Sequence, residues 1–285
     1  MSTANLKQTK KAETFRALHT GGEPVLLPNV WDAASARIVE DAGYPALATT
    51  SAGVAFTLGY PDGQKISRDE MLGVIRRIAN VAAVPVSADV EGGYGPRPED
   101  SGRTARALIE AGAVGLNLED ATGDASNPLF ELPLQLEKIR AVREASSALG
   151  VPLVLNARTD VYLWQVGKPE TWYDASVKRL SAYRDAGADC VFVPGLSDAS
   201  TIGRIVADLR CPVNILAGPG SPSVPELKAL GVARISLGSS PMRATLGVLR
   251  RVATELKLQG TYESMAEAPS HGELNALIGS RAPGR

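Results

Sequence analysis

Two stretches decide the fold of this chain: Val84-Pro-Val-Ser-Ala-Asp-Val-Glu91 and Gly115-Leu-Asn-Leu-Glu-Asp120. Each is a short apolar run, the pattern of a strand buried on both faces of a parallel sheet, and each ends in carboxylates. Buried carboxylates are unfavourable unless a positive charge meets them, so we expect a divalent metal at these strand ends. Asp89, Glu91 and Glu119 have no imidazole or thiolate beside them in the sequence. This all-oxygen set favours Mg²⁺, with Mn²⁺ as a substitute.

Similar apolar runs recur along the chain and alternate with amphipathic helical patterns. The expected strands are residues 25–28, 46–50, 84–89, 115–119, 153–157, 190–193, 213–217 and 234–237. The expected helices between and after them are residues 32–42, 68–81, 98–111, 134–149, 173–186, 198–209, 224–230 and 239–256. Four of these helices are followed by a glycine that can close the last turn: Gly43, Gly112, Gly187 and Gly231. Eight β-then-α units predict an α/β fold of the (β/α)₈ TIM-barrel type, with a doubly wound open sheet as the alternative.

Length and composition indicate one domain. A chain of 285 residues, with 44% hydrophobic and 21% charged residues, can bury the core of one barrel. We expect residues 1–259 to form this single barrel, including an N-terminal helix over about residues 4–18. Residues 260–285 contain Pro, Gly and Ser without clear periodicity, and we expect a C-terminal tail or arm there.

Charge and hydropathy exclude several classes of partner. The net charge is −1 and no Lys/Arg cluster is present, so nucleic-acid binding is not expected. There is no run of about 18 apolar residues, and the N-terminus is polar, so neither a membrane span nor a signal peptide is expected. We therefore expect a cytoplasmic protein whose partners are small metabolites.

Further polar residues fall at the C-terminal ends of the expected strands, where barrel enzymes have their active sites. They are residues 49–53, Asn117, Asp120, Asn156, Arg158 and Asn214. Arg158 is the expected fixed cation, because its planar guanidinium matches a carboxylate or an enolate oxygen. The alternative for Arg158 is a salt bridge to a neighbouring acid. The two histidines, His19 and His271, are expected at the surface, and Cys190 and Cys211 are expected to be buried thiols.

Several motifs in register resemble the isocitrate lyase/phosphoenolpyruvate mutase superfamily over about residues 27–246. They are Leu27-Pro-Asn-Val-Trp-Asp-Ala-Ala-Ser-Ala-Arg37, Thr49-Thr-Ser-Ala-Gly53, Asp62-Gly63, Asp89-Val-Glu-Gly-Gly-Tyr-Gly95, Gly115-Leu-Asn-Leu-Glu-Asp120 and Asn156-Ala-Arg-Thr-Asp160. The resemblance implies a TIM-type barrel with its eighth helix swapped between the subunits of a homo-oligomer, a dimer or a tetramer. It also implies a Mg²⁺-dependent enzyme that acts on small 2-oxo or 2-hydroxy acids.

The same resemblance implies roles for single residues. Asp62, Asp89, Glu91 and Glu119 would hold the metal, directly or through its waters. The substrate would be bound by Ser51, Ala52, Gly53, Arg158, Asn127 and Asn214, with backbone N–H groups and a hydroxyl of residues 51–53 facing its carboxylate. The catalytic residues would be Arg158, Asp62 and Glu119.

The segment Ala121-Thr-Gly-Asp-Ala-Ser-Asn-Pro-Leu-Phe130 departs from the best-known members of the superfamily. Isocitrate and methylisocitrate lyases carry a Lys-(Lys/Arg)-Cys-Gly-His loop there, whereas this segment contains neither Cys nor His. Phosphoenolpyruvate mutase and phosphonopyruvate hydrolase carry a Lys-Thr-Asn-Ser type segment. Asn127 matches its Asn, but Ala125 stands where the Lys would be.

These residues favour cleavage of a C–C bond beside the carbonyl of a small 2-oxo acid, through an enolate that the metal stabilises. The expected enzyme is similar to oxaloacetate decarboxylase and related to methylisocitrate lyase. One alternative is a C–P bond enzyme of the phosphoenolpyruvate mutase or phosphonopyruvate hydrolase type. The other is a protein that binds a 2-oxo acid without catalysis.

Overall fold

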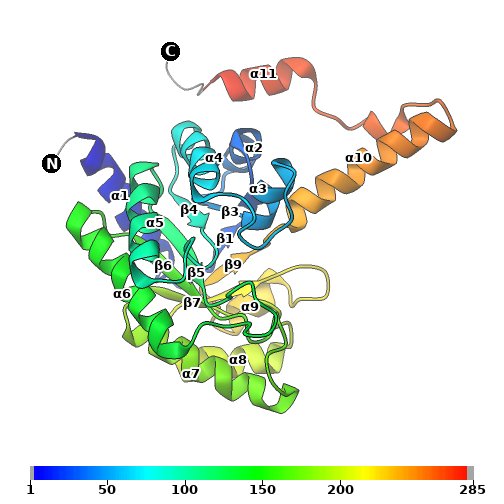
Figure 1. The fold of residues 1–285 in the computed structure, drawn as a ribbon. Coiled ribbons are helices and arrows are strands. Elements are labelled where there is room, and N and C mark those ends of the chain that lie inside the picture. Colours follow the sequence, from blue (N-terminus) through cyan, green and yellow to red (C-terminus); the bar gives the residue numbers. More distant parts are fainter. Residues whose placement is uncertain (1–2, 281–285) are drawn as a thin grey trace.

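Parallel strands form a closed ring in the computed structural model, which describes residues 3–280 (Figure 1). The strands are β1 (Val25–Leu27), β2 (Asn29–Val30), β3 (Leu47–Thr49), β4 (Val86–Asp89), β5 (Gly115–Glu119), β6 (Val154–Arg158), β7 (Cys190–Phe192), β8 (Val213–Leu216) and β9 (Arg234–Ser236). Their order in the sheet is β1-β9-β8-β7-β6-β5-β4-β3-β2. Because β1 and β2 are consecutive pieces of the chain, the sheet returns on itself. The predicted TIM-type barrel is confirmed.

The first barrel strand is interrupted at Pro28. β1 pairs only with β9 in the sheet order, and β2 pairs with β3. Proline has no N–H group to donate to a neighbouring strand, so the ladder breaks there and the segment changes its pairing partner. The eight predicted strands therefore correspond to the barrel strands of the structure, with the first one divided.

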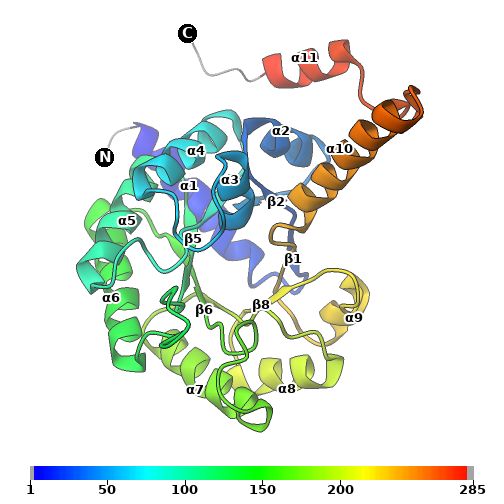
Figure 2. The same ribbon diagram turned by 45° about the vertical axis from the view of Figure 1, so that its right-hand side comes forward.

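Helices alternate with the strands and surround the barrel (Figure 2). They are α1 (Thr3–Leu18), α2 (Ala33–Asp41), α3 (Ser51–Thr57), α4 (Arg68–Val81), α5 (Pro98–Glu110), α6 (Leu132–Leu149), α7 (Trp172–Asp185), α8 (Ala199–Leu209), α9 (Val224–Ala229), α10 (Ser240–Leu258) and α11 (His271–Gly279), with 3₁₀ turns η1 (Pro169–Thr171) and η2 (Glu263–Met265). Every predicted helix is present, whereas the sequence pattern does not predict α3 or α11. The four glycines expected to close helices have φ values from 81° to 110°, as their role requires.

The helix α4 illustrates how local sequence sets these boundaries. Ser67 accepts a hydrogen bond from the Glu70 N–H (3.2 Å), and the Glu70 carboxylate accepts one from the Ser67 N–H (2.9 Å). This reciprocal capping box satisfies N–H groups that have no partner within the helix. Met71, Ile75 and Ile78 then repeat at helical spacing and are fully buried against the barrel.

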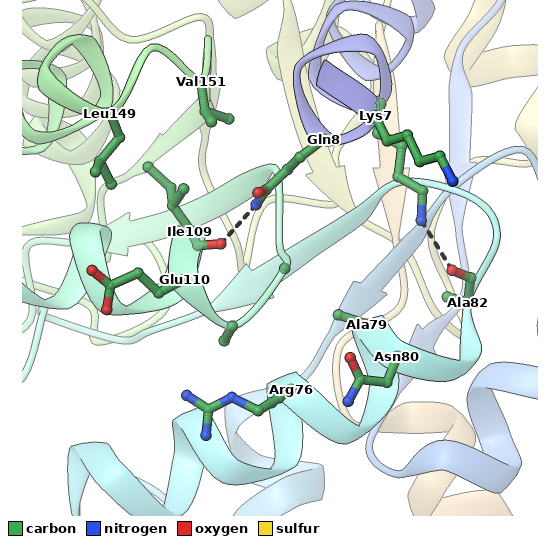
Figure 3. Close-up of a pocket in the computed structure, with 13 residues that line it drawn as sticks. Lys7, Gln8, Arg76, Ala79, Asn80, Ala82, Ile109, Glu110, Leu149 and Val151 are labelled. Carbon is green, nitrogen blue, oxygen red and sulfur yellow. Dashed lines mark hydrogen bonds between the residues drawn. The ribbon is translucent and has the colours of Figure 1, made fainter. Parts of the chain in front are cut away.

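The N-terminal helix α1 covers the end of the barrel where the strands begin. Its side chains donate hydrogen bonds to carbonyl groups at or just beyond the ends of three barrel helices. Gln8 Nε2 donates to Ile109 (2.7 Å; Figure 3) and to Ala113 (3.0 Å). Lys11 Nζ donates to Ala82 (3.0 Å), and Thr9 Oγ1 donates to Gly150 (3.3 Å). The last carbonyls of a helix have no intrahelical partner, so these bonds anchor α1 to α4, α5 and α6. The cavity of about 650 Å³ beside them therefore lies at the opposite end of the barrel from the predicted acids.

The helix α10 extends away from the barrel, and the chain after it folds back over α2 (Figures 1 and 2). Arg37 of α2 donates to the carbonyl of Leu277 (3.4 Å) and to Ser280 Oγ (3.1 Å), which ties α11 to the barrel. Residues 260–285, expected to be a tail or arm, thus contain the helix α11. Its apolar residues show only weak helical periodicity. No helix in residues 3–280 is long and apolar enough to cross a membrane.

The histidines and cysteines differ in their surroundings. The prediction of a surface position is wrong for His19, which is 6% exposed because it lies one turn after the buried Phe15 on the face of α1 that packs on the barrel. Burial and the nearby Arg234 lower the pKa of His19 to about 4. His271 is exposed, as expected. Cys190 is buried and Cys211 is half-buried, and burial raises the pKa of both thiols.

Candidate active site

Three predicted acids meet at the C-terminal ends of β4 and β5. Asp89 is the last residue of β4, and it lies level with Asn117 of β5. Glu119 ends β5, and its N–H donates to the carbonyl of Glu91, just beyond β4 (3.0 Å). Asp89, Glu91 and Glu119 are between 4% and 8% exposed. The strand ends therefore gather buried carboxylates, as the two apolar runs predict.

Asp62 approaches the same group of acids from the loop between α3 and α4. Partial desolvation and the Asp89 carboxylate raise the pKa of Asp62, while Arg158 lowers it. The Asp62 carboxylate therefore lies within the electrostatic influence of Asp89, although Asp62 is an exposed residue. The N–H of Gln64, two residues later, donates to the Glu91 carboxylate and fixes this loop against the acids.

The carboxylates influence one another's ionisation. Burial, followed by the charges of Asp89 and Asp62, raises the pKa of Glu91 to about 8. Burial also raises the pKa of Glu119, and the neighbouring Arg158 opposes this effect. A divalent cation would favour the ionised form of each group, so the set fits a hard metal ion.

The acids do not form a ready-made metal cage. Within residues 3–280, no three His, Cys, Asp or Glu side chains converge closely enough to ligate one ion together. Mg²⁺ usually keeps several waters and takes only one or two carboxylates directly, so a site with separated acids suits it better than Zn²⁺. The roles of Asp62, Asp89, Glu91 and Glu119 as ligands stay predictions.

Residues 51–53, the predicted substrate cradle, form the first turn of α3. Ser51 donates to Asp89 Oδ2 from its hydroxyl (2.9 Å) and from its N–H (3.2 Å). The Gly53 N–H donates to the side chain of Thr50, the N-cap of α3 (3.4 Å). A Cβ atom at position 53 would lie 2.6 Å from Thr50 Cγ2, so glycine is required by close packing. These contacts orient Asp89, and the binding of substrate by Ser51, Ala52 and Gly53 stays a prediction.

Arg158, at the end of β6, lies between two acids. Its Nη1 pairs with Glu119 Oε2 (2.9 Å), and its Nε donates to Asp160 Oδ1 (2.6 Å). Burial lowers the pKa of Arg158, but Asp160, Glu119 and Asp89 outweigh burial, and the net shift is upward. The guanidinium is thus a fixed cation at the edge of the acid group. The salt bridge to a neighbouring acid, predicted as the alternative role of Arg158, is present. The sequence motif does not indicate the second pairing, between Arg158 and Asp160.

The two asparagines assigned to the substrate lie in different places. Asn127 is exposed in the loop 121–130 and borders a cavity of about 510 Å³, together with Gln64 and Lys65. Asn214 is fully buried on β8, where its amide exchanges hydrogen bonds of 3.3 Å with Ser236 of β9. The structure thus brings Asn127 to the loops above the acids and joins Asn214 to the barrel wall. Neither role in substrate binding is tested by these contacts.

Asp120 follows Glu119 in sequence but has a different function. Its carboxylate is fully buried and accepts four hydrogen bonds, from the hydroxyls of Thr159 (2.7 Å) and Tyr183 (2.6 Å), the N–H of Asp160 (2.9 Å) and Nη1 of Arg179 (3.2 Å). Both of its oxygens therefore accept hydrogen bonds within the protein, and Asp120 holds β5, β6 and α7 together.

Curated relatives match nearly the whole chain. An uncharacterized protein of Mycobacterium tuberculosis (strain ATCC 25618 / H37Rv) is 35% identical over 265 residues, covering 93% of this chain and 96% of the relative. The oxaloacetate decarboxylase of Bradyrhizobium diazoefficiens is 30% identical and covers 88% of each chain. The 2-methylisocitrate lyase of Escherichia coli (strain K12) is 29% identical, covering 90% of this chain and 87% of the relative.

Solved structures agree with these matches. A Burkholderia cenocepacia J2315 protein, provisionally designated a lyase/mutase, has a TM-score of 0.90 at 42% identity and covers 95% of this chain and 96% of its own. Oxaloacetate acetylhydrolase in complex with oxalate has a TM-score of 0.83 at 28% identity, with 94% of both chains covered. A profile of the phosphoenolpyruvate phosphomutase family matches residues 15–257. The chain is therefore an enzyme of the phosphoenolpyruvate phosphomutase family, within the isocitrate lyase/phosphoenolpyruvate mutase superfamily.

Proposed function

We propose that this enzyme is a Mg²⁺-dependent lyase that removes CO₂ from oxaloacetate or a closely similar 2-oxo acid. The proposal rests on the composition of the site. Three buried carboxylates and one guanidinium lie at the strand ends, with Asp62 in the loop between α3 and α4, and loop 121–130 contains no cysteine and no histidine. This set provides for a metal and a substrate carboxylate, but it lacks the acid that larger lyase substrates require.

We infer that the metal is held by Asp62, Asp89, Glu91 and Glu119, directly or through its waters. Their oxygen donors are those that Mg²⁺ prefers, and Mn²⁺ is expected to substitute. When bound, Mg²⁺ supplies positive charge beside the substrate carbonyl, where negative charge develops as the C–C bond breaks. The crowding that raises the pKa of Glu91 to about 8 supports a cation at this position.

The protein's own groups would bind and orient the substrate. Arg158, held in place by Asp160 and Glu119, would bind the carboxylate beside the carbonyl. Ser51 fixes the orientation of Asp89 and, with Ala52 and Gly53, would face the same carboxylate. Asn127 at the loop cavity and Asn214 in the barrel wall are the remaining proposed contacts. In this scheme, Arg158, Asp62 and Glu119 are the catalytic residues.

The absence of a thiol acid from loop 121–130 is what favours decarboxylation. A lyase that releases a carboxylate-bearing enolate must protonate it, and a positioned acid speeds that step. Loss of CO₂ leaves the enolate of pyruvate, which also gains one proton but can take it from water after CO₂ has departed, so decarboxylation requires less of the loop. The similarity to the oxaloacetate decarboxylase of Bradyrhizobium diazoefficiens supports the same conclusion.

A C–P bond enzyme is the second candidate. A Burkholderia cenocepacia J2315 protein, provisionally designated a phosphonomutase, is 41% identical to this chain with a TM-score of 0.82. Against this candidate, Ala125 stands at the loop position where a lysine would stabilise a phosphoryl group in transfer.

One assay separates these functions. The purified enzyme is incubated with Mg²⁺ and oxaloacetate, phosphonopyruvate, isocitrate or 2-methylisocitrate in parallel, and product release is compared with the rate of Mg²⁺ alone. We expect pyruvate from oxaloacetate above the metal-only rate, abolished by EDTA and restored by Mg²⁺ or Mn²⁺. Pyruvate formation no faster than with Mg²⁺ alone would refute the decarboxylase proposal, and turnover of phosphonopyruvate alone would favour the second candidate.

We also propose that α10 is exchanged between subunits of a homo-oligomer. Five aliphatic side chains of α10 are between 42% and 73% exposed: Leu246, Val248, Leu249, Leu256 and Leu258. Such a helix needs a partner to bury its apolar surface, and a second subunit provides one. Light scattering after size exclusion is expected to give a dimer or a tetramer, and a monomer at micromolar concentration would contradict this proposal.

A further inference from the structure

A tyrosine hydroxyl beside the acid group has no partner within the protein. Tyr94 lies in the turn after β4, three residues beyond Glu91. Its Oη atom is buried and forms no hydrogen bond with any residue that the structure describes. A buried hydroxyl without a partner is unfavourable, so we expect a hydrogen-bond partner that is not part of the chain.

The backbone that carries Tyr94 is strained. The φ angle of Tyr94 is 58° and that of Glu91 is 51°, both in the left-handed region that residues with a side chain seldom adopt. Two such residues within one four-residue turn raise the energy of the folded state. Strain of this kind persists where the surrounding structure enforces it, and it is concentrated at functional sites.

The surroundings of this turn do enforce its conformation. Three side chains bind its backbone: Gln64 Oε1 accepts from the Tyr94 N–H (2.9 Å), Thr104 Oγ1 donates to the Gly93 carbonyl (2.9 Å), and Lys138 Nζ donates to the Gly95 carbonyl (3.1 Å). A Cβ atom at position 95 would lie 2.4 Å from the Asp100 carboxylate, so no other residue fits there. The turn that carries Glu91 and Tyr94 is therefore held from several sides in one conformation.

The phenol of Tyr94 lies in the field of all four acids. Burial raises its pKa, and so do the charges of Glu91, Asp89, Glu119 and Asp62. A tyrosine hydroxyl is protonated at neutral pH and is an O–H donor.

We propose that Tyr94 is a substrate-binding residue whose hydroxyl donates a hydrogen bond to an anionic oxygen of the bound 2-oxo acid. This assignment supplies a partner for a hydroxyl that is buried and has none among residues 3–280. The assignment takes the class of ligand, a small 2-oxo acid, from the proposed function. It does not depend on which reaction follows binding.

The test is to measure oxalate binding by the Tyr94→Phe variant in the presence of Mg²⁺. Oxalate is used because it matches the carboxylate and oxyanion of a 2-oxo acid enolate and is not turned over. We expect oxalate to bind about tenfold more weakly to the variant, by calorimetry, since a hydrogen bond to a charged group is lost. The Tm of the variant should equal or exceed that of the wild type, because Phe removes a hydroxyl that has no partner in the chain.

Two other tyrosines provide matched controls. Tyr44→Phe, at the end of the barrel where the strands begin, should change neither oxalate binding nor Tm. Tyr183→Phe should lower Tm, because its hydroxyl donates to Asp120 (2.6 Å). If Tyr94→Phe behaves like either control, with oxalate affinity unchanged, the proposal is wrong. It is also wrong if the variant loses Mg²⁺ affinity without oxalate, since the hydroxyl would then act on the metal site.

These outcomes are independent of the reaction. If the wild type binds oxalate but forms no pyruvate from oxaloacetate, the decarboxylase proposal fails, and the Tyr94 comparison still decides the role of the hydroxyl. If the wild type with Mg²⁺ binds no oxalate, the ligand class is wrong and the assignment of Tyr94 fails with it.

Discussion

Replacing Asp120 with Asn is expected to destabilise the enzyme strongly. The variant keeps the volume of the side chain and removes its charge. Asp120 Oδ2 accepts from Thr159, Tyr183 and Arg179, and Oδ1 accepts from the Asp160 N–H. An amide has only one acceptor oxygen, so its NH₂ group must face at least one of these donors, and the Arg179 guanidinium loses its counter-charge.

The magnitude follows from the burial of the group. Removing one partner of a buried ion pair typically destabilises a protein by about 3–5 kcal/mol, because the other charge is left uncompensated. Arg179 is partly solvated, with 17% of its side chain exposed, so we expect the lower end, about 3 kcal/mol. That is a large fraction of the roughly 5–15 kcal/mol that stabilises a typical domain.

Urea unfolding measures the effect. The midpoint should fall while the m-value stays constant, which would show that the folded and unfolded states keep their compactness. Tyr183→Phe should give a smaller loss, and the double variant should lose less than the sum, because both groups belong to one network. A decrease below about 1 kcal/mol for Asp120→Asn would refute the structural role, since this is the size of a single neutral hydrogen bond.

Three further predictions concern the site and its surroundings. Asp89→Asn should abolish Mg²⁺-dependent activity while circular dichroism stays unchanged; full activity in this variant, or in EDTA, would exclude the metal site. Arg158→Lys keeps the charge but loses the planar fork, and kcat/KM should fall on the order of 30- to 1,000-fold; an unchanged value would make Arg158 purely structural. His19 has a pKa of about 4 in the folded state against 6.5 in the unfolded state, so between these values the unfolded chain binds the extra proton. The free energy of unfolding should therefore fall as pH falls from 6.5 to 4, by about 3 kcal/mol in all, and His19→Gln should flatten this dependence; equal pH profiles for both proteins would contradict it.

The barrel and its acidic end could be predicted because both depend on short-range sequence patterns. An apolar run indicates a buried strand, and the order of its residues shows that Asp89 or Glu119 lies at its C-terminal end. Because the strands are parallel, both carboxylates lie at the same end of the barrel. The helix ends at Gly112 and Gly187 are equally local, since a left-handed residue is needed wherever a helix closes in this way.

Other features depend on partners that are distant in sequence. Glu119 and Asp120 are neighbours with the same side-chain chemistry, and only contacts with residues some 40 to 60 positions later distinguish them. His19 is buried because α1 packs across the barrel, which its own polar sequence does not indicate. The division of the first strand at Pro28 becomes visible only when both of its neighbours in the sheet are known.

The distribution of charge at the strand ends suggests where a metal and a substrate would lie. On the side of β5, β6 and α7, every acid of the site has an arginine partner, since Arg179 pairs with Asp120 and Arg158 pairs with both Glu119 and Asp160. On the side of β4, none of the ion pairs in residues 3–280 involves Asp62, Asp89 or Glu91. The acids without an arginine partner therefore lie on the β4 side, and the fixed positive charge of Arg158 marks its boundary. A dianionic 2-oxo acid that reaches from a cation beside β4 to Arg158 would satisfy both sides at once.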